Sequence, residues 1–257
     1  MPLLALNNLS HIYHSPSGET EAIKNITLSV NEREFVSIVG PSGCGKSTLL
    51  SILAGLLEPS SGEVKIDNKK LNEAKDLIAL MPQRDQLFEW RNILKNVTLS
   101  PEIKRNKTPE TIEYAKILLE KYGLKDFMYK RPSELSGGMR QRAALIRTLV
   151  GSPKLLLLDE PFSALDFQTR LAVCDDVSSI IAEEKKTAIL VTHDISEAIS
   201  MSSKIIVLTE RPAQIKTIYD IDLDKNIPPL KRREQKSFNV YFRNVWRDLE
   251  ANNERRT

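Results

Sequence analysis

The feature that most constrains this chain is a glycine-rich loop that ends in a lysine and hydroxyl residues. The sequence Gly40-Pro41-Ser42-Gly43-Cys44-Gly45-Lys46-Ser47-Thr48 fits the pattern G-x-x-x-x-G-K-[ST]. A strand-like apolar run, residues 34–39, precedes it, and a helix-like run, residues 48–57, follows it. In such a unit the glycines turn backbone N–H groups toward one point, and the helix dipole adds positive charge there. The loop predicts a nucleoside triphosphate site, with Lys46 at the β- and γ-phosphates and Ser47 on Mg²⁺.

Composition narrows the class of protein. The chain has 257 residues, and its 37 Lys and Arg against 34 Asp and Glu leave a formal net charge of +3. So small an excess does not favour nucleic acid as the main ligand, and we expect no such partner. Cys44 and Cys174 lack metal-like spacing and suit a reducing compartment. With neither a signal-peptide pattern nor an apolar run of membrane-spanning length, a soluble, cytoplasmic chain is expected.

The N-terminal residues predict an antiparallel sheet. Residues 3–9 and 23–30 alternate in polarity around a polar loop at residues 15–20. Tyr13 precedes this loop, where its ring could stack on adenine or serve as a core or edge residue, and both interpretations stay open. His11 and His14 flank it without a carboxylate or cysteine partner, so we expect no metal site there.

Two buried strands end in polar side chains. Residues 77–81 lead into Gln83, whose amide could reach Mg²⁺ or an attacking water, because parallel sheets place ligand groups at the carboxyl ends of strands. Residues 155–158 lead into Asp159 and Glu160. Asp159 is suited to hold Mg²⁺ through water, and Glu160 is suited to accept a proton from that attacking water or to orient it.

Between these strands the pattern becomes helical. Leu87, Phe88, Trp90, Ile93, Leu94 and Val97 lie in a segment without strand alternation, and a helix follows from a cap at Thr108 to Gly123. The apolar side chains are either core or a docking groove for a partner helix. Ser136-Gly137-Gly138 then opens a helix through Val150, which makes a second anion site.

Six motifs occur in order at fitting intervals. They are residues 40–48, Gln83, residues 135–142, residues 155–160, Ser163-Ala164-Leu165-Asp166 and Thr192-His193-Asp194. With them the chain closely resembles the ATP-binding subunit of an ABC transporter, from the N-terminus to about residue 210. The resemblance implies an α/β fold of the ABC-type P-loop class: a RecA-like core, an N-terminal antiparallel β subdomain and an inserted helical subdomain at about residues 84–150. All of residues 1–257 would then form a single ATP-binding domain.

The resemblance also implies site roles. Tyr13 becomes the adenine-stacking aromatic, Gln83 the Q-loop residue, Ser136, Gly137 and Gly138 the signature, and His193 the switch histidine. Asp166 joins the nucleotide-contacting residues, and Lys46, Gln83, Glu160 and His193 form the catalytic set. Because the signature lies in another subdomain, we expect a head-to-tail homodimer in which each signature caps the partner's ATP.

The C-terminal segment, about residues 210–257, predicts a strand and then a helix with Phe238, Phe242, Val245 and Leu249 at helical spacing. Its basic run, Lys231-Arg232-Arg233, is interpreted as a solvated face, with contact to anionic lipid headgroups as the alternative. We expect no added regulatory domain. Cys44, inside the anion nest, is either a thiolate-favouring, reactive residue or an inert small side chain.

Without a membrane span, such an ATPase needs separate permease subunits, which places it at the cytoplasmic face of the membrane. Met139 and residues 83–91 resemble the nitrate/sulfonate/taurine importer type, a subgroup that also includes importers of vitamin precursors, although Glu89 replaces a frequent proline. We therefore expect uptake of a small solute, indirectly with a solute-binding protein. An exporter remains open. A DNA-repair ATPase, a two-cassette translation factor and a non-hydrolysing sensor fit poorly, since Lys46 and Ser136 share one domain and Glu160 and His193 are both present.

Overall fold

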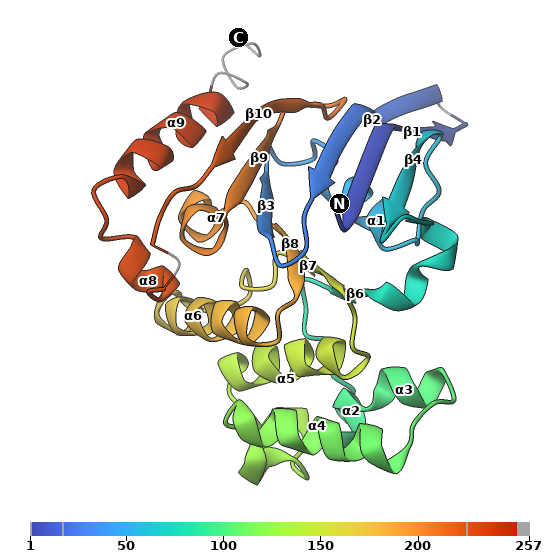
Figure 1. The fold of residues 1–257 in the computed structure, drawn as a ribbon, viewed down its shortest axis with the longest axis vertical. Coiled ribbons are helices and arrows are strands. Elements are labelled where there is room, and N and C mark those ends of the chain that lie inside the picture. The colour runs from blue at the N-terminus through green and yellow to red at the C-terminus, as the bar shows by residue number, and fades with distance from the viewer. Residues whose placement is uncertain (1, 17, 225, 251–257) are drawn as a thin grey trace.

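The structure is a computed structural model that describes residues 2–16, 18–224 and 226–250 (Figure 1). Two sheets lie side by side, and a group of helices lies below them in this view. The expected loop at residues 15–20 includes residue 17, and the expected C-terminal segment includes residues 225 and 251–257, which fall outside the described residues. The α/β class is confirmed by the sheets and helices of the described residues.

The N-terminal sheet is antiparallel, as the alternating sequence predicts. Strand β1 (Leu4–Ser15) pairs with β2 (Gly18–Val30), and Leu4 lies opposite Val30. The sheet continues through β4 (Ser61–Ile66) to β5 (Lys69–Lys70), in the order β2-β1-β4-β5. Its apolar face packs on α1 (Lys46–Leu53), the helix that follows the glycine loop. The first sheet therefore supports the helix that begins at the end of the glycine loop.

The central sheet explains why the sequences of its strands are almost continuously apolar. Its order is β10-β9-β3-β8-β7-β6, and all but β10 run parallel. Both faces of a parallel sheet are covered, so four or more of the five residues in each of the four inner strands are buried. The strands are β3 (Phe35–Val39), β6 (Ile78–Met81), β7 (Leu155–Asp159), β8 (Thr187–Val191), β9 (Lys204–Leu208) and β10 (Ile215–Asp220). Because β3 lies in the middle, the segments that follow β6, β7, β8 and β9 meet the glycine loop at one edge.

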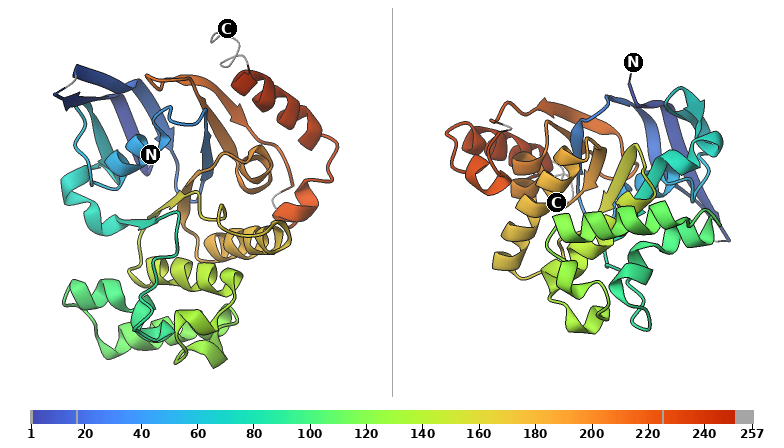
Figure 2. Two further views of the ribbon diagram at one scale, coloured as in Figure 1. Left: turned by 180° about the vertical axis from the view of Figure 1, so that it is seen from behind. Right: turned by 60° about the horizontal axis from the view of Figure 1, so that its bottom comes forward.

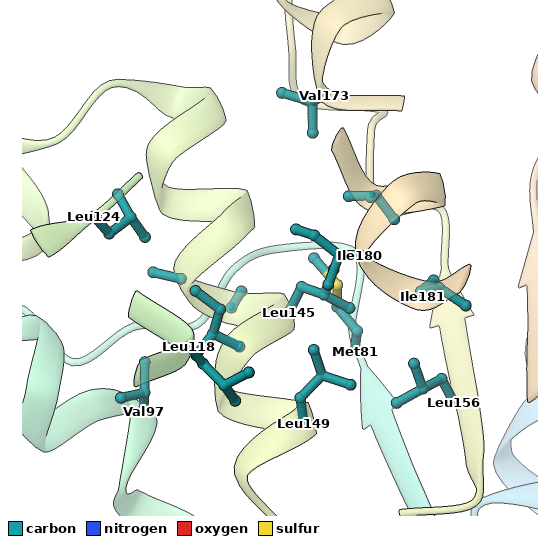
Figure 3. Packing of buried hydrophobic residues seen from close by; sticks show 14 of the residues in the cluster. Met81, Val97, Leu118, Leu124, Leu145, Leu149, Leu156, Val173, Ile180 and Ile181 are labelled. Carbon is teal, nitrogen blue, oxygen red and sulfur yellow. The ribbon is translucent and has the colours of Figure 1, made fainter. Parts of the chain in front are cut away.

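The helical region packs on the central sheet through one apolar cluster. It contains α2 (Ile93–Val97), α3 (Leu99–Ile103), α4 (Pro109–Lys121) and α5 (Gly137–Val150). Figure 3 shows Leu145 and Leu149 of α5 between Leu118 of α4 and the residues Met81 and Ile180 of the core. Short 3₁₀ turns lie at Leu71–Glu73, Lys75–Leu77, Lys125–Phe127 and Pro132–Glu134.

Side-chain caps start these helices where the sequence predicts them. Thr108 accepts a hydrogen bond from the Thr111 N–H at 3.3 Å, and Ser136 accepts one from the Met139 N–H at 3.4 Å. Each cap satisfies a backbone donor that the first turn of a helix leaves without an intrahelical partner. The predicted starts of α4 and α5 are confirmed.

The C-terminal residues add β10 at the edge of the central sheet opposite β6, and two helices lie beside that end of the sheet (Figure 2). These are α8 (Pro229–Arg232) and α9 (Phe238–Glu250); α6 (Phe167–Glu183) and α7 (Ile195–Met201) complete the set of described α-helices. The prediction of a solvated basic face is wrong for Arg232. Its guanidinium is buried and donates to the carbonyl oxygens of Ile227 at 2.9 Å and Ser200 at 3.0 Å.

Among the described residues, none of the helices combines the length and the apolar character that crossing a bilayer requires.

Candidate functional site

A cavity of about 640 Å³ opens where the glycine loop meets the carboxyl edge of the central sheet. Its lining comes from the first sheet, the loop and the segments after β7, β8 and β9. The lining residues are Tyr13, Ala22, Ser42, Gly43, Gly45, Lys46, Ser47, Thr48, Glu160, His193 and Arg211. Most of them are residues that the sequence marks as candidate ligands.

The glycine loop has a backbone that other residues would not adopt. Gly43 has φ +71° and Gly45 has φ +129°, and a Cβ on Gly45 would lie 2.7 Å from the Ala22 carbonyl oxygen. The Lys46 ammonium donates to the carbonyl oxygens of Gly40 at 2.8 Å and Pro41 at 2.9 Å. The loop therefore brings a nearly buried positive charge to the same place as the N-terminus of α1.

Tyr13 stands at the mouth of this cavity rather than in a core. Its side chain is 43% exposed, its hydroxyl lies 3.2 Å from Thr48 Oγ1, and its ring meets the edge of His11. The core interpretation of Tyr13 is wrong, because the ring is accessible from solvent. A flat apolar surface is thus available beside the loop.

Three strand ends converge on one carboxylate. Glu160, just after β7, has its Oε2 atom 3.1 Å from His193 Nδ1 and accepts a 3.4 Å hydrogen bond from Gln83 Nε2. Gln83 Nε2 also donates to Ser163 Oγ at 3.2 Å. The Glu160 N–H donates to the Val191 carbonyl oxygen at 2.9 Å, and this bond fixes the Glu160 backbone beside the end of β8. The structure thus brings together Gln83, Glu160 and His193.

Asp159, the last residue of β7, lies next to this group. Burial raises the pKa of its carboxyl, the neighbouring Glu160 charge raises it further, and Lys46 opposes both. A half-buried carboxylate of this kind gains stability from a nearby cation. The position is therefore chemically suited to a divalent metal ion.

Cys44 is not the reactive thiol that a helix N-terminus predicts. Its side chain is only 2% exposed, and burial raises its pKa more strongly than the charge of Lys46 lowers it. The Sγ atom packs so closely that a Cβ on Gly40 would lie 3.0 Å from it. The prediction that this environment favours thiolate is wrong, because loss of hydration outweighs the positive field.

The second glycine segment lies apart from the cavity. Ser136 and Gly137 are exposed at the start of α5. Gly138 is buried, and a Cβ there would lie 2.9 Å from Val173 Cγ2. Asp166 is exposed and caps α6, accepting from the Thr169 N–H at 3.0 Å, and hydrogen bonds from the Thr169 side chain and from this N–H lower its pKa. The described residues that line the cavity include none of these four.

Arg211 is a cavity residue that sequence reasoning missed. Its guanidinium donates to the Gly43 carbonyl oxygen, from Nη2 at 2.8 Å and from Nε at 3.2 Å. A usable signal existed, since Arg211 follows a strand-like run and lies in a turn before Pro212. What the sequence did not reveal is that β9 pairs with β3, which puts that turn beside the loop.

Comparisons with known proteins agree with this arrangement. The sequence profile of the family described as "ABC transporter" matches residues 23–163. The "Uncharacterized ABC transporter ATP-binding protein YtlC" of Bacillus subtilis (strain 168) is 45% identical over 98% of this chain and 97% of its own length. The "Taurine import ATP-binding protein TauB" of Roseobacter denitrificans is 36% identical over 90% of this chain and 89% of its own length.

A solved structure has the same fold. It is the dimeric "post-hydrolysis state of the ATP-binding cassette MJ0796 bound to ADP and Pi", with a TM-score of 0.72 and 32% identity. The match covers 85% of this chain and 98% of that one.

Proposed function

This chain belongs to the ABC transporter family as an ATP-binding subunit that hydrolyses ATP, and we propose that it powers uptake of a small solute through separate permease subunits. The observation that carries the proposal is that Lys46, Glu160 and His193 line one cavity and that Gln83 donates a hydrogen bond to Glu160. Import is supported by the name of the taurine relative and by the resemblance of Met139 and residues 83–91 to importers. We propose a nitrate-, sulfonate-, taurine- or vitamin-precursor-like solute, with a solute-binding protein as an indirect partner.

We propose that the triphosphate lies along residues 40–48 and that the adenine stacks on Tyr13. The backbone N–H groups of the loop and the dipole of α1 attract the phosphates. The Lys46 ammonium would exchange the Gly40 and Pro41 carbonyls for the β- and γ-phosphate oxygens, a stronger charge-assisted interaction. Arg211 adds a second cation at the same edge.

The donor set fits Mg²⁺ held jointly with the nucleotide. Among the described residues, no group of three or more His, Cys, Asp or Glu side chains is placed to bind a metal ion alone. Mg²⁺ at phosphate sites is usually held by one or two carboxylates together with the phosphates. Ser47, Gln83 and Asp159 would supply the protein oxygens, and bound Mg²⁺ would neutralise charge on the β- and γ-phosphates.

Glu160 is proposed as the group that orients the attacking water or accepts its proton. Gln83 and His193 hold its carboxylate from two sides, so little rearrangement is needed when water arrives. His193 would also donate to the γ-phosphate from the end of β8. These residues act on the nucleotide bound to their own chain.

Ser136, Gly137 and Asp166 are proposed to act on the nucleotide of a second copy. Both segments are exposed and lie outside the cavity lining, while the N-terminus of α5 is suited to an anion. A head-to-tail homodimer would place each signature over the partner's ATP. The related cassette of known structure is dimeric, which supports this arrangement.

A permease helix is proposed to dock in a second cavity, of about 670 Å³, between the core and the helical region. Phe88 lines it together with Leu56 and Ile103, which are 71% and 72% exposed. Trp90 stacks on Phe88 beside it. The expectation that Ile93 lines such a groove is wrong, since Ile93 is fully buried in the core. This docking would hold the chain at the cytoplasmic face of the membrane.

Cellular uptake tests the direction of transport. Labelled nitrate, taurine and a pyrimidine vitamin precursor are supplied to cells that carry this chain, with its permease, or the Lys46→Ala variant. The proposal predicts that the variant loses accumulation of at least one compound. An exporter would give the opposite result, with more compound retained in the variant than in cells with the unaltered chain.

A further inference from the structure

We propose that Arg140 and Arg147 of α5 are positioning residues that tie the segment after Gln83 to the helix that carries the signature. Displacement of residues 85–91 would then be passed directly to Ser136. The inference rests on the proposed function in one respect, because it assumes that Ser136 acts on the ATP of a partner chain. Neither arginine is bonded to Lys46 or Glu160, two charged residues that line the nucleotide cavity.

The first tie joins Arg140 to Asp85. Arg140 Nε donates to Asp85 Oδ2 at 2.9 Å, and the two side chains are only 32% and 15% exposed. The second carboxylate oxygen of Asp85 accepts from the Leu87 N–H at 3.0 Å, so the acceptor cannot turn freely. A partly shielded, charge-assisted hydrogen bond with fixed partners is stronger than an exposed ion pair.

The second tie joins Arg147 to the backbone of the same segment. Its Nη2 donates to the Asp85 carbonyl at 2.7 Å, and its Nη1 donates to the Gln86 carbonyl at 2.8 Å. The rigid, planar guanidinium matches two successive carbonyls, which a lysine could not do. Gln86 has φ +47°, so the chain turns here to present both oxygens.

A buried amide fixes the rest of the segment. Asn96 of α2 is fully buried; its Oδ1 accepts from the Phe88 N–H at 2.7 Å, and its Nδ2 donates to the Phe88 carbonyl at 3.1 Å. Phe88, Gln86 and Arg147 all line the proposed docking cavity. The part of the cavity wall that Gln86 and Phe88 form is therefore bonded to α5 and α2.

Gln83, by contrast, is bonded to the core through Glu160 and Ser163. Between Gln83 and Asp85 the chain therefore passes from hydrogen bonds with the core to hydrogen bonds with α5. Arg140 lies in the first turns of α5, close in sequence to the Ser136 cap. A push on the cavity wall would thus move the N-terminus of α5 relative to Gln83, and the effect would reach the partner's site and not the chain's own.

Mixed dimers purified through two different affinity tags test this inference. In the first dimer, Arg140→Ala lies on one chain and Lys46→Ala on its partner. The ATP site built on the Lys46→Ala loop is disabled, and the other ATP site combines an intact loop with an intact signature. In the second, both changes lie on one chain beside an unaltered partner, so the remaining site depends on the altered α5. We expect the first dimer to match a Lys46→Ala/unaltered dimer, and the second to lose about 10-fold to about 100-fold in kcat with the KM for ATP unchanged.

Equal losses in both dimers would overturn the inference, because Arg140 would then act on its own site or through folding. Arg140→Lys should restore most of the activity, and Lys130→Ala, which removes an exposed ion pair with Glu134 just before the signature, should have no effect.

Hydrogen–deuterium exchange of the full-length chain gives a readout that does not depend on the dimer. Arg140→Ala should speed exchange in residues 84–91 and in residues 135–140 together, with an unchanged melting temperature. Unchanged exchange in either segment would contradict the proposed tie. If exchange rises as expected while the two mixed dimers lose activity equally, Arg140 does bond the two segments together, but its proposed action on the partner's site fails, and the head-to-tail premise fails with it.

Discussion

The chemistry of single residues centres on Glu160, whose carboxylate is held by side chains from two other strand ends. Gln83 and His193 fix its direction, and the bond from its N–H to Val191 fixes its backbone. General-base assistance depends on such placement before it depends on acidity. The carboxylate is therefore the group whose removal should affect chemistry without affecting nucleotide binding.

We expect Glu160→Gln to keep ATP affinity and to slow phosphate release by about 100-fold or more, the usual loss when a general base is removed. Lys46→Ala should instead weaken ATP binding, because it removes the cation at the β- and γ-phosphates. Equilibrium ATP binding and phosphate release, measured on both variants, separate the roles, with exposed Glu58→Gln as the control. Hydrolysis at a near-normal rate by Glu160→Gln would disprove its assigned role.

Burial rather than the loop's positive field decides the behaviour of Cys44. Since the raised pKa leaves less thiolate at neutral pH and the side chain is almost inaccessible, we expect iodoacetamide to cause no loss of ATPase activity in the folded chain. Mass spectrometry should show modification only after unfolding. Rapid alkylation that inhibits, and that Mg-ATP prevents, would restore the reactive interpretation.

Residue chemistry was most directly predictable where one motif carries its own partners. The candidates in residues 40–48 come together because a single turn builds that site. Arg211 was missed because its place depends on which strands pair, and Arg232 was misjudged because its carbonyl partners lie on other segments. A sequence shows that a side chain is charged, but not whether the fold supplies it with acceptors.

At the scale of elements, the buried parallel strands and the capped helices were predictable. Continuous apolar runs such as residues 155–158 specify a covered strand, and Thr108 and Ser136 mark helix starts through their own hydrogen bonds. The segment at residues 85–97 was less predictable. Its short helix α2 is set by the Asn92 cap and by bonds from the Ile93 and Leu94 N–H groups to distant carbonyl oxygens, rather than by any repeated spacing.

That segment leads to a prediction about Trp90, which is 73% exposed and stacks on Phe88. Trp90→Ala should leave melting temperature and basal ATPase near normal but weaken permease association, because truncating an aromatic anchor costs about 2 kcal/mol or more of binding. Pull-down with the permease, measured on one preparation, tests this. Trp246→Ala, a partly exposed tryptophan on α9 that also stacks on a phenylalanine, is the matched control. A Trp90→Ala chain that still binds its permease and transports would rule out the docking role.

At the scale of the whole molecule, the two helix starts that the sequence marks as anion sites do not face one cavity. The start of α1 lies in the cavity lining, whereas the start of α5, with Ser136 and Gly137, is exposed elsewhere. The motifs at residues 40–48 and 136–138 predicted both helix starts. The resemblance to ABC subunits predicted that the two starts act on the nucleotides of different copies. Their separation could not be read from spacing, because it depends on how the helical region packs on the central sheet.

If two copies complete each other's ATP sites, the ATPase rate per chain should depend on protein concentration. We expect this rate to fall on dilution, as sedimentation shows dimers dissociating under assay conditions. Ser136→Arg should stay inactive at every concentration while binding ATP with normal affinity. A chain shown to be monomeric that hydrolyses ATP at the full, dilution-independent rate would show that each copy is complete by itself.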